Sequence, residues 1–547
     1  MKLGSIDISC EYVVFGASKF GKAVIRALKL FNVKVRCLCD NDFQKWGTIV
    51  NSVAVISPKD LEAMEKDIPI IIASFYFETI LRQLESLKFT NLVYFPYEAF
   101  LGGKNAAIWK SIPELVDIQI RSDEYRNEVN SNIIDGIFIK NIVPVKKGEK
   151  IRIVFLFQTI QHWPSWESVW EECITDDRID AKIIIFEYNK MHAYQKKTDV
   201  EKACVNTKSP HEFLNRKGIE FVDLDDFDLD AFRPHVMLLQ HPHSICRPRF
   251  LSNNALRVKG IRLAYIPYGI ELPLDAPEFK EIELNTPLIN SSWRAYTLSP
   301  EMKNEYVRYT DSFGSMVRVT GHPKFDGLFH SERFPLPKTT QERIKNRKLG
   351  FWNIHFPSTR DLLEEAKTVI TAFSFEEYEQ FVLKIKDYED KVVFIVTTHP
   401  AFYARYESLG MGDKARGFRE LLQSIENIVY MHGDDYRPGM LNADFIMTDH
   451  SALSAEAGAT MKPVLFLDYP NRITRIGNPM GDMIDKYYHG STVDDVSNFI
   501  EMCLRDEDPL KETRIAAFRK AVPYFDGLCG RRIKEDMVNS LYKEINY

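Results

Sequence analysis

Apolar residues gather in short continuous runs along the whole chain, separated by stretches in which apolar positions recur every three to four residues. Runs of four to eight apolar residues are typical of strands buried on both faces of a parallel sheet. The three-to-four spacing is typical of helices that cover such a sheet. The alternation of the two patterns predicts an α/β protein built from parallel strand–helix–strand units.

The first 100 residues form one such series. We expect a helix over residues 19–31 and another in "FETILRQLESL". Residues 101–149 are polar and weakly patterned, so they are expected to form a linker after a small Rossmann-like accessory domain over residues 1–100. The predicted strands of this domain are "EYVVFGAS", "VKVRCLCD", "IPIIIAS" and "NLVYFP".

Two further series follow, over residues 150–315 and 316–547. They predict two doubly wound Rossmann-like domains in tandem that face each other across a cleft, with ligands at the carboxyl ends of the strands. The mainly helical segment after Ser491 is expected to pack back across that cleft. The predicted strands are "KIRIVFLFQT", "AKIIIFEYN", "IEFVDL", "HVMLLQH" and "IRLAYIPYG", then "KLGFWNIHFPST", "KVVFIVTTHP", "NIVYMHG", "ADFIMTDHS" and "PVLFLDYP".

Composition narrows the class of protein. Of the 547 residues, 45% are hydrophobic and 27% charged, which suits soluble globular domains. The net charge of −6 argues against a broad nucleic-acid surface. The apolar runs fall short of a bilayer span, the first residues show no signal-peptide pattern, and the eight cysteines lack zinc spacing. We therefore expect a cytoplasmic protein with reduced thiols.

The first domain carries a loosened dinucleotide fingerprint. Gly16 and Gly21 follow the first strand, Ser18 stands where the middle glycine is usual, and Asp40 ends the second strand. Such a turn can bind phosphate at a helix start, with the acid on a ribose hydroxyl. An accessory nucleotide site and a purely structural turn are equally compatible with this pattern.

A polar turn joins a buried strand to a helix in "TDHSALSAE". Ser451 suits the helix cap, and unpaired amides at a helix start also favour an anion. Ser451, Ser454 and nearby backbone amides could hold a diphosphate, and Asp449 and His450 precede them in the same turn as further candidate donor-binding residues. Glu456, one turn further, is either a ribose contact or a solvated helix residue.

Several histidines follow predicted strands, where a side chain faces a ligand rather than the core. His399 could donate to a phosphate or move a proton, and His162 takes a similar place in the preceding domain. His322 lies in the turn-like "TGHPKFDGL" between the two domains. Solvated or phosphate-facing residues are favoured over metal ligands at His241, His243, Arg247 and Arg249.

Two arginines, Arg531 and Arg532, begin a predicted helix near the carboxyl terminus. Cations at a helix start oppose the helix dipole, so helix stability does not explain them. Binding an acidic group would explain them, and a solvated face is the alternative.

The ordered motifs resemble those of the CDP-glycerol glycerophosphotransferase family, which includes teichoic-acid primases and polymerases. The matching segments are "TGHPKFDGL", "IHFPSTRD", "TTHP", "FIMTDHSALSAEAGATMKPVLF" and "YFDGLCGRRI", between about Arg318 and Lys534. The resemblance implies a GT-B fold in which Asp449, Ser451 and Glu456 contact the donor and His399 contacts its diphosphate. The first 100 residues resemble, more loosely, nucleotide-binding modules fused to sugar-modifying enzymes.

The chain departs from the family pattern in two places. His450, Ala452 and Glu456 stand where the family usually has Tyr, Ser and Asp. Tyr268, followed by Gly269, stands where the family has the His of a His-Gly pair implicated in acceptor activation. Tyrosine is a poor base near neutral pH, so His162 is the candidate acceptor base.

The leading hypothesis is a transferase that moves a glycerol-phosphate-like unit from a CDP-activated donor to a hydroxyl of a surface polymer or its lipid-linked precursor, in teichoic-acid or capsule synthesis. Mg²⁺ is a candidate cofactor, and peripheral contact with the inner membrane face is compatible with such an acceptor. A GT-B glycosyltransferase with a nucleotide-sugar donor and a non-catalytic nucleotide-sugar-binding protein are the alternatives.

Overall fold

The computed structural model describes the chain as two compact units, residues 1–135 and 136–547. Within them it describes residues 10–18, 21–22, 24–25, 28, 33–74, 77–94, 134–186, 210–242, 247–273, 275, 280, 283–355, 373–400, 402–408, 411–432, 435–469 and 475–545. None of the helices described is long and apolar enough to span a bilayer.

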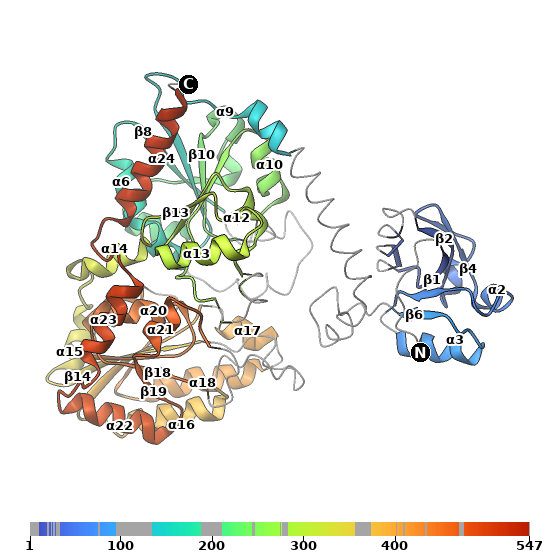
Figure 1. Ribbon diagram of the computed structural model, residues 1–547. Helices are drawn as coiled ribbons and strands as arrows, with labels where there is room; N and C mark the ends of the chain where they lie inside the picture. The colour runs from blue at the N-terminus through green and yellow to red at the C-terminus, as the bar shows by residue number, and fades with distance from the viewer. Residues whose placement is uncertain are drawn as a thin grey trace. The chain divides into compact units, whose positions relative to one another are not determined.

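The first unit holds a six-stranded sheet in the order β3-β4-β2-β1-β5-β6 (Figure 1). All pairings are parallel except that of β3 with β4. The chain reverses direction across the sheet between β1 and β5, as in a Rossmann fold. The elements are β1 Glu11–Phe15, β2 Lys34–Cys39, β3 Ile49–Val50, β4 Val53–Ile56, α2 Pro58–Glu62, β5 Ile70–Ile72, α3 Phe77–Ser86 and β6 Leu92–Tyr94.

The second unit contains two separate parallel sheets, which we call the first half and the second half. The first-half sheet has the order β13-β12-β11-β10-β7-β8-β9. Its central strands are continuous apolar runs because helices cover both faces. The strands are β7 Ile151–Phe157, β8 Ile179–Ile185, β9 Val222–Asp223, β10 Val236–Leu239, β11 Arg262–Tyr265, β12 Arg294–Thr297 and β13 Val317–Val319.

The second-half sheet has the order β16-β15-β14-β17-β18-β19, the doubly wound order of a Rossmann fold. Numbered along the chain within the half, this order is 3-2-1-4-5-6. The strands are β14 Lys348–Ile354, β15 Val392–Thr398, β16 Ile428–His432, β17 Phe445–Thr448, β18 Val464–Leu467 and β19 Tyr488–Gly490.

Helices connect the strands and pack on the sheets. Those of the first half are α6 Glu167–Ile174, α8 Pro210–Arg216, α9 Leu229–Phe232, α10 Asn253–Val258, α12 Pro287–Ser291 and α13 Pro300–Tyr309. Those that follow β13 are α14 Lys324–Phe329, α15 Lys338–Ile344, α16 Phe375–Lys386, α17 Phe402–Ser408, α18 Gly412–Ser424, α19 Arg437–Asn442, α20 Ala452–Ala457, α21 Met480–Ile484, α22 Val493–Leu504, α23 Lys511–Ala521 and α24 Cys529–Ile545.

The last helix, α24, returns to the first half and packs beside α6 (Figure 1). Its apolar stripe is fully buried in the core beneath β7 and β8. Burying each such side chain is worth roughly 1.5–3 kcal/mol. The residues of the stripe are Ile533, Met537, Val538 and Leu541.

Asp326 fixes the start of this returning helix. Its carboxylate accepts hydrogen bonds from the backbone N–H groups of Cys529, at 2.9 Å, and Gly530, at 2.8 Å. Gly321 has φ +77°, and a Cβ there would lie 2.5 Å from Cys529 Sγ. The two passages of the chain between the halves are therefore packed against each other.

The strand orders confirm the predicted fold class: a small Rossmann-like sheet followed by two doubly wound ones. The predicted return of a carboxyl-terminal helix is also confirmed. Several strands were not predicted: β3 and β4 of the first unit, β12 and β13, which complete the first-half sheet, and β19 of the second-half sheet. The hydrogen bond from the Val143 N–H, in the predicted linker, to the Gly260 carbonyl was not predicted either. Most of the helix predicted over residues 19–31 lies outside the described residues.

We predict that Asp326→Ala lowers the free energy of unfolding by about 1–3 kcal/mol, because it removes a helix cap and leaves two buried donors without a partner. Urea denaturation measures the change. The matched control is Asp177→Ala, which removes an exposed acid after α6. Equal stabilities of the two variants would contradict the capping role of Asp326.

Candidate functional site

The carboxyl edge of the second-half sheet brings several polar side chains together where the strand order reverses, between β14 and β17. Asp449 is buried and accepts hydrogen bonds from the backbone N–H of His355, at 2.9 Å, and from the Tyr378 hydroxyl, also at 2.9 Å. Asn353 donates its side-chain N–H to Ser451 Oγ at 2.8 Å. The turn after β17 is thus held to the end of β14.

Three histidines lie at the ends of adjacent strands beside this turn. The rings of His355 and His399 have centroids 4.7 Å apart, and Thr398 Oγ1 lies 2.9 Å from His432 Nδ1. In the sheet register, Ile354 pairs with Thr398, and Thr398 pairs with His432. Parallel register therefore sets three imidazoles along one edge.

The protonation of this edge is set by its surroundings. Burial, together with the nearby His355 and His432, lowers the pKa of His399 well below its ordinary value. Burial raises the pKa of Asp449 to about 7, against the opposing effect of its two hydrogen bonds. Neutral imidazoles can donate an N–H to phosphate oxygen or accept a proton.

The first-half sheet presents a second polar edge where its strand order reverses, between β7 and β10. His162 follows β7, and Gln240 follows β10 and donates its amide N–H to the His162 carbonyl at 2.7 Å. The Tyr268 ring stacks on His162 at 4.6 Å and on His241 at 5.7 Å. Burial lowers the pKa of His162 well below its ordinary value, so its imidazole is neutral near pH 7.

The two edges meet. A Cβ at Gly269, directly after Tyr268, would lie 3.4 Å from the Cβ of Ala452 at the start of α20. Pro273 lies further along the loop after β11, and its carbonyl accepts a hydrogen bond at 2.7 Å from the N–H of Gly477, which follows β18. The loop after β11 therefore lies against the turn after β17.

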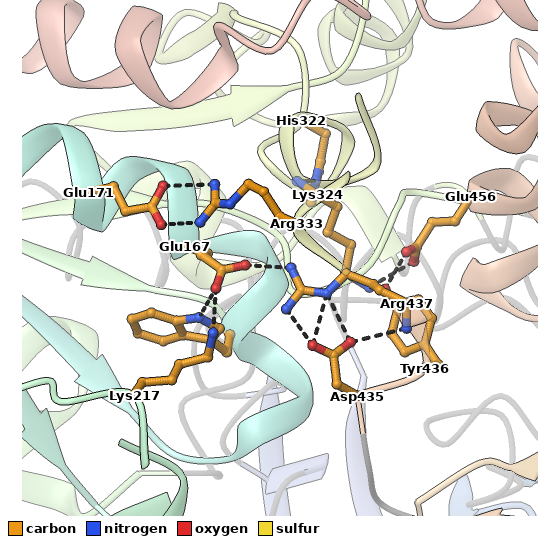
Figure 2. A network of polar contacts seen from close by, with 11 residues as sticks. Glu167, Glu171, Lys217, His322, Lys324, Arg333, Asp435, Tyr436, Arg437 and Glu456 are labelled. Carbon is orange, nitrogen blue, oxygen red and sulfur yellow. Dashed lines mark hydrogen bonds and ion pairs between the residues drawn. The ribbon is translucent and has the colours of Figure 1, made fainter. Parts of the chain in front are cut away.

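A buried polar network lies behind α20 (Figure 2). Lys324, on α14, donates to Glu456 Oε1 at 2.8 Å, and the Tyr436 hydroxyl donates to Glu456 Oε2. Glu456 is fully buried and Lys324 is 5% exposed. Both oxygens of this carboxylate are engaged within the protein.

A second buried pair links the halves directly (Figure 2). Glu167, on α6, contacts Arg437, at the start of α19, and Lys217 Nζ lies 2.6 Å from Glu167 Oε1. Burial alone would raise the pKa of Glu167, but the charges of Arg437 and Lys217 outweigh it and lower this pKa to about 2. Arg437 is also held by Asp435 at 2.7 Å. The interface is thus joined by charges that stay ionised.

The structure gives the predicted donor residues different surroundings. Ser451 occupies the helix-cap position of α20, but its side chain makes no capping hydrogen bond and accepts from Asn353 instead. Ser454 is buried and donates its hydroxyl to the Ser451 carbonyl at 2.7 Å. His450 is partly exposed between Asp449 and Ser451. The alternative of a solvated Glu456 is wrong, because Lys324 and Tyr436 enclose this residue, and a contact of Glu456 with the donor stays a prediction.

Acidic groups of the protein itself face the two arginines of α24. Arg532 pairs with Asp526, with Nη1 3.0 Å from Oδ1, and Arg531 lies 3.9 Å from Glu172 of α6. Asp526 therefore gives Arg532 a partner within the protein, Arg531 is 61% exposed, and donor binding by either arginine stays a prediction. His322 is buried and hydrogen-bonds the Pro267 carbonyl at 3.0 Å.

Close packing explains the two glycines of the dinucleotide fingerprint in the first unit. Gly16 has φ +119°, and a Cβ there would lie 2.2 Å from the Ala73 carbonyl oxygen; one at Gly21 would lie 1.7 Å from the Gly16 oxygen. Asp40 accepts from the Ala17 N–H at 2.6 Å, and Ser18 is exposed. These contacts favour the structural turn, and nucleotide binding there stays a prediction.

Sequence reasoning missed His355, His432 and Asn353. The first two stand at strand ends, as His399 does, so the same signal could have found them. Asn353 lies within the apolar run of β14, where no local pattern marks it. Within the described part of the chain, no group of three or more His, Cys, Asp or Glu residues is placed to hold a metal ion.

Comparisons with known proteins give one family match and several distant structures. Residues 10–91 match the family described as C2185-like, N-terminal. A search of curated proteins found no match. A putative UDP-N-acetylglucosamine 2-epimerase from Listeria monocytogenes is 16% identical with a TM-score of 0.48, covering 72% of this chain and 97% of its own.

Two other solved structures are similarly distant. The wall teichoic acid polymerase TagF is 12% identical with a TM-score of 0.47, covering 77% of this chain and 97% of its own. UDP-GlcNAc 2-epimerase from Neisseria meningitidis, bound to UDP-GlcNAc, is 16% identical with a TM-score of 0.45, covering 71% and 100%. Likenesses this low say nothing about chemistry, which rests on the residues of the site.

We predict that Asp449 makes stability fall as pH rises from about 4 to 7. Its pKa is about 7 when folded and about 3.9 when unfolded, so the folded state binds more protons in this window. In Asp449→Asn, the midpoint of urea unfolding should change less with pH over this range than in the wild-type protein. Asp444→Asn, just before β17, is the control; a slope unchanged in Asp449→Asn would contradict the assignment.

We also predict that Glu167→Gln lowers the free energy of unfolding by about 3 kcal/mol, because it leaves Arg437 buried with one partner fewer. Glu171→Gln on the same helix is the matched control. Its pair with Arg333 is about 40% exposed on both sides, so the loss there should stay below about 1 kcal/mol. Similar losses in the two variants would contradict the special role of the buried pair.

Proposed function

We propose that residues 136–547 form a transferase that holds a nucleotide-activated donor at the second-half edge and an acceptor hydroxyl at the first-half edge. One observation carries this proposal: the two edges at which the strand orders reverse lie against each other, with Gly269 on Ala452. Ligands of doubly wound sheets bind at such edges. A donor and an acceptor held there can react directly.

The second-half edge suits a diphosphate. His355 and His399 can donate N–H groups to phosphate oxygens, and the first amides of α20 have no partner within the helix. As the bond to the leaving nucleotide breaks, negative charge grows on that nucleotide, and such fixed donors stabilise it. Glu456 supports this edge from behind by pairing with Lys324.

The donor we favour is a CDP-activated alcohol, on the strength of the ordered motifs over residues 318–534. The acceptor oxygen attacks the β-phosphorus, a new P–O bond forms, the bond to CMP breaks, and His162 takes the acceptor proton. A neutral imidazole is the form able to do so. The product would be part of a surface polymer such as teichoic acid or a phosphate-containing capsule, and a lipid-linked acceptor would bring the enzyme to the inner membrane face.

A GT-B glycosyltransferase is the second candidate, favoured by Tyr268. This residue stands where the family has a histidine, and its ring covers the proposed base His162. In this case the acceptor oxygen attacks the anomeric carbon of a sugar, and a nucleoside diphosphate leaves. The third candidate is a protein that binds a nucleotide sugar without turnover.

The nucleotide distinguishes the candidates. A thermal-shift panel of CMP, CDP, UDP and GDP shows which one binds; a ligand at 100 times its Kd adds about 2.7 kcal/mol of stability. Release of CMP during turnover supports phosphoryl transfer, release of UDP or GDP supports glycosyl transfer, and binding without turnover supports the third candidate. Turnover with and without a chelator tests the predicted use of Mg²⁺.

We predict that His399→Ala lowers turnover by roughly 10²–10⁴-fold, the range for a positioned acid–base group. Steady-state kinetics at saturating donor measure the loss. His330→Ala, which removes a half-exposed histidine after α14, is the matched control and should keep turnover. Near-normal turnover in His399→Ala would remove this residue from the mechanism.

A further inference from the structure

Several buried polar atoms at the first-half edge have no hydrogen-bond partner, among them Gln161 Nε2. Two others are Nδ1 of His162 and Oε1 of Gln240, on side chains that are 7% and 3% exposed. The two residues are adjacent, because Gln240 donates its amide N–H to the His162 carbonyl at 2.7 Å. Buried polar atoms are nearly always paired in folded proteins, so two orphans at one sheet edge point to a ligand that supplies partners.

A flat aromatic ring, that of Tyr268, lies against His162. Tyr268 is 43% exposed, and its ring is stacked on His162 with an interplanar angle of 23° and on His241 with one of 17°. The Tyr268 carbonyl is fixed by the Ser165 hydroxyl at 2.8 Å. Since Gly269 touches the start of α20, this ring lies beside the proposed donor edge.

The chemistry of the orphan atoms selects the ligand. Gln240 Oε1 only accepts, so its partner must carry a hydrogen. A phosphate that is ionised near pH 7 mainly accepts, whereas a hydroxyl both donates and accepts. The positive charge of Lys324 contributes to the lowered pKa of His162, but this ammonium is already paired with Glu456 at 2.8 Å. A neutral, hydroxyl-bearing group therefore fits this edge better than an anion.

We propose that Tyr268, His162 and Gln240 form a subsite for a pyranose ring, so that the acceptor ends in a carbohydrate rather than in a glycerol phosphate. The proposal rests on the proposed function. One face of the sugar carries C–H groups that pack on the Tyr268 ring, and its hydroxyls donate to Gln240 Oε1 and to His162 Nδ1. Tyr268 then determines acceptor specificity, at the position where the family resemblance places a histidine.

Ligand-detected NMR tests the subsite on the full chain without any donor. The probes are methyl glycosides of glucose, mannose and N-acetylglucosamine, with glycerol 3-phosphate as the acyclic anionic comparison. We expect saturation transfer to the ring protons of at least one glycoside and none to glycerol 3-phosphate. Tyr268→Ala should raise the Kd of that glycoside at least about 10-fold, and Tyr268→Phe, which keeps the flat ring, should leave it within about 3-fold.

The matched control is Phe313→Ala, which removes a 76% exposed aromatic of the same half and should leave glycoside binding unchanged. Tyr268→Leu replaces Tyr268→Ala if the latter does not fold, because leucine is apolar but not flat. Wild-type affinity in the Ala or Leu variant, no glycoside binding at all, or binding of glycerol 3-phosphate alone would each overturn the subsite.

Nucleotide titration separates this proposal from the proposed function. Nucleotide binding without glycoside binding overturns the carbohydrate subsite and leaves the transferase proposal standing. Glycoside binding that Tyr268→Ala abolishes, in a protein that binds none of the nucleotides, supports the subsite and overturns the transferase.

Discussion

The arrangement of the two halves depends on charges buried between them. Glu167 of the first half meets Arg437 of the second (Figure 2). Removing an ion from water costs several kcal/mol, which only a well-placed partner offsets. A sliding or rotated interface would separate these two buried ions, so the pair favours one relative placement. The contact of Gly269 with Ala452, and with it the opposition of the two sheet edges, follows from that placement.

The Lys324–Glu456 pair explains why the short helix α20 carries a buried acid. Glu456 does not face solvent: it ties the helix that follows the Asp449–Ser451 turn to Lys324, which lies just after the chain enters the second half. The turn is also held from the front, since Asn353 binds Ser451 and the His355 N–H binds Asp449. A site of this kind is rigid before any ligand arrives, which suits a reaction driven by positioning.

Sequence patterns predicted most of the buried strands and the polar residues that follow them, but not the contacts between residues far apart along the chain. Buried strands stood out as long apolar runs, so the polar residues after them, such as His399 and Asp449, could be placed at a sheet edge. Strands β12 and β13 are short and contain Arg294 and Arg318, so no continuous apolar run marks them. The partners of Glu456 and Ser451 could not be predicted, because Lys324 and Asn353 lie 132 and 98 residues away along the chain. The sequence therefore did not indicate that Glu456 is buried and paired with Lys324.

The return of α24 sets the order in which the protein can be completed during synthesis. Lys534 of this helix pairs with Asp176, 358 residues earlier in the chain. At the usual 5–20 residues per second, a ribosome needs roughly 20–70 s to make the stretch between them. The strands of the first half are finished only when β13 ends at Val319, and from then until α24 is made their apolar face lacks its last cover. The nascent chain therefore carries an exposed hydrophobic surface during the later part of its synthesis, a form on which chaperones act and from which aggregation starts.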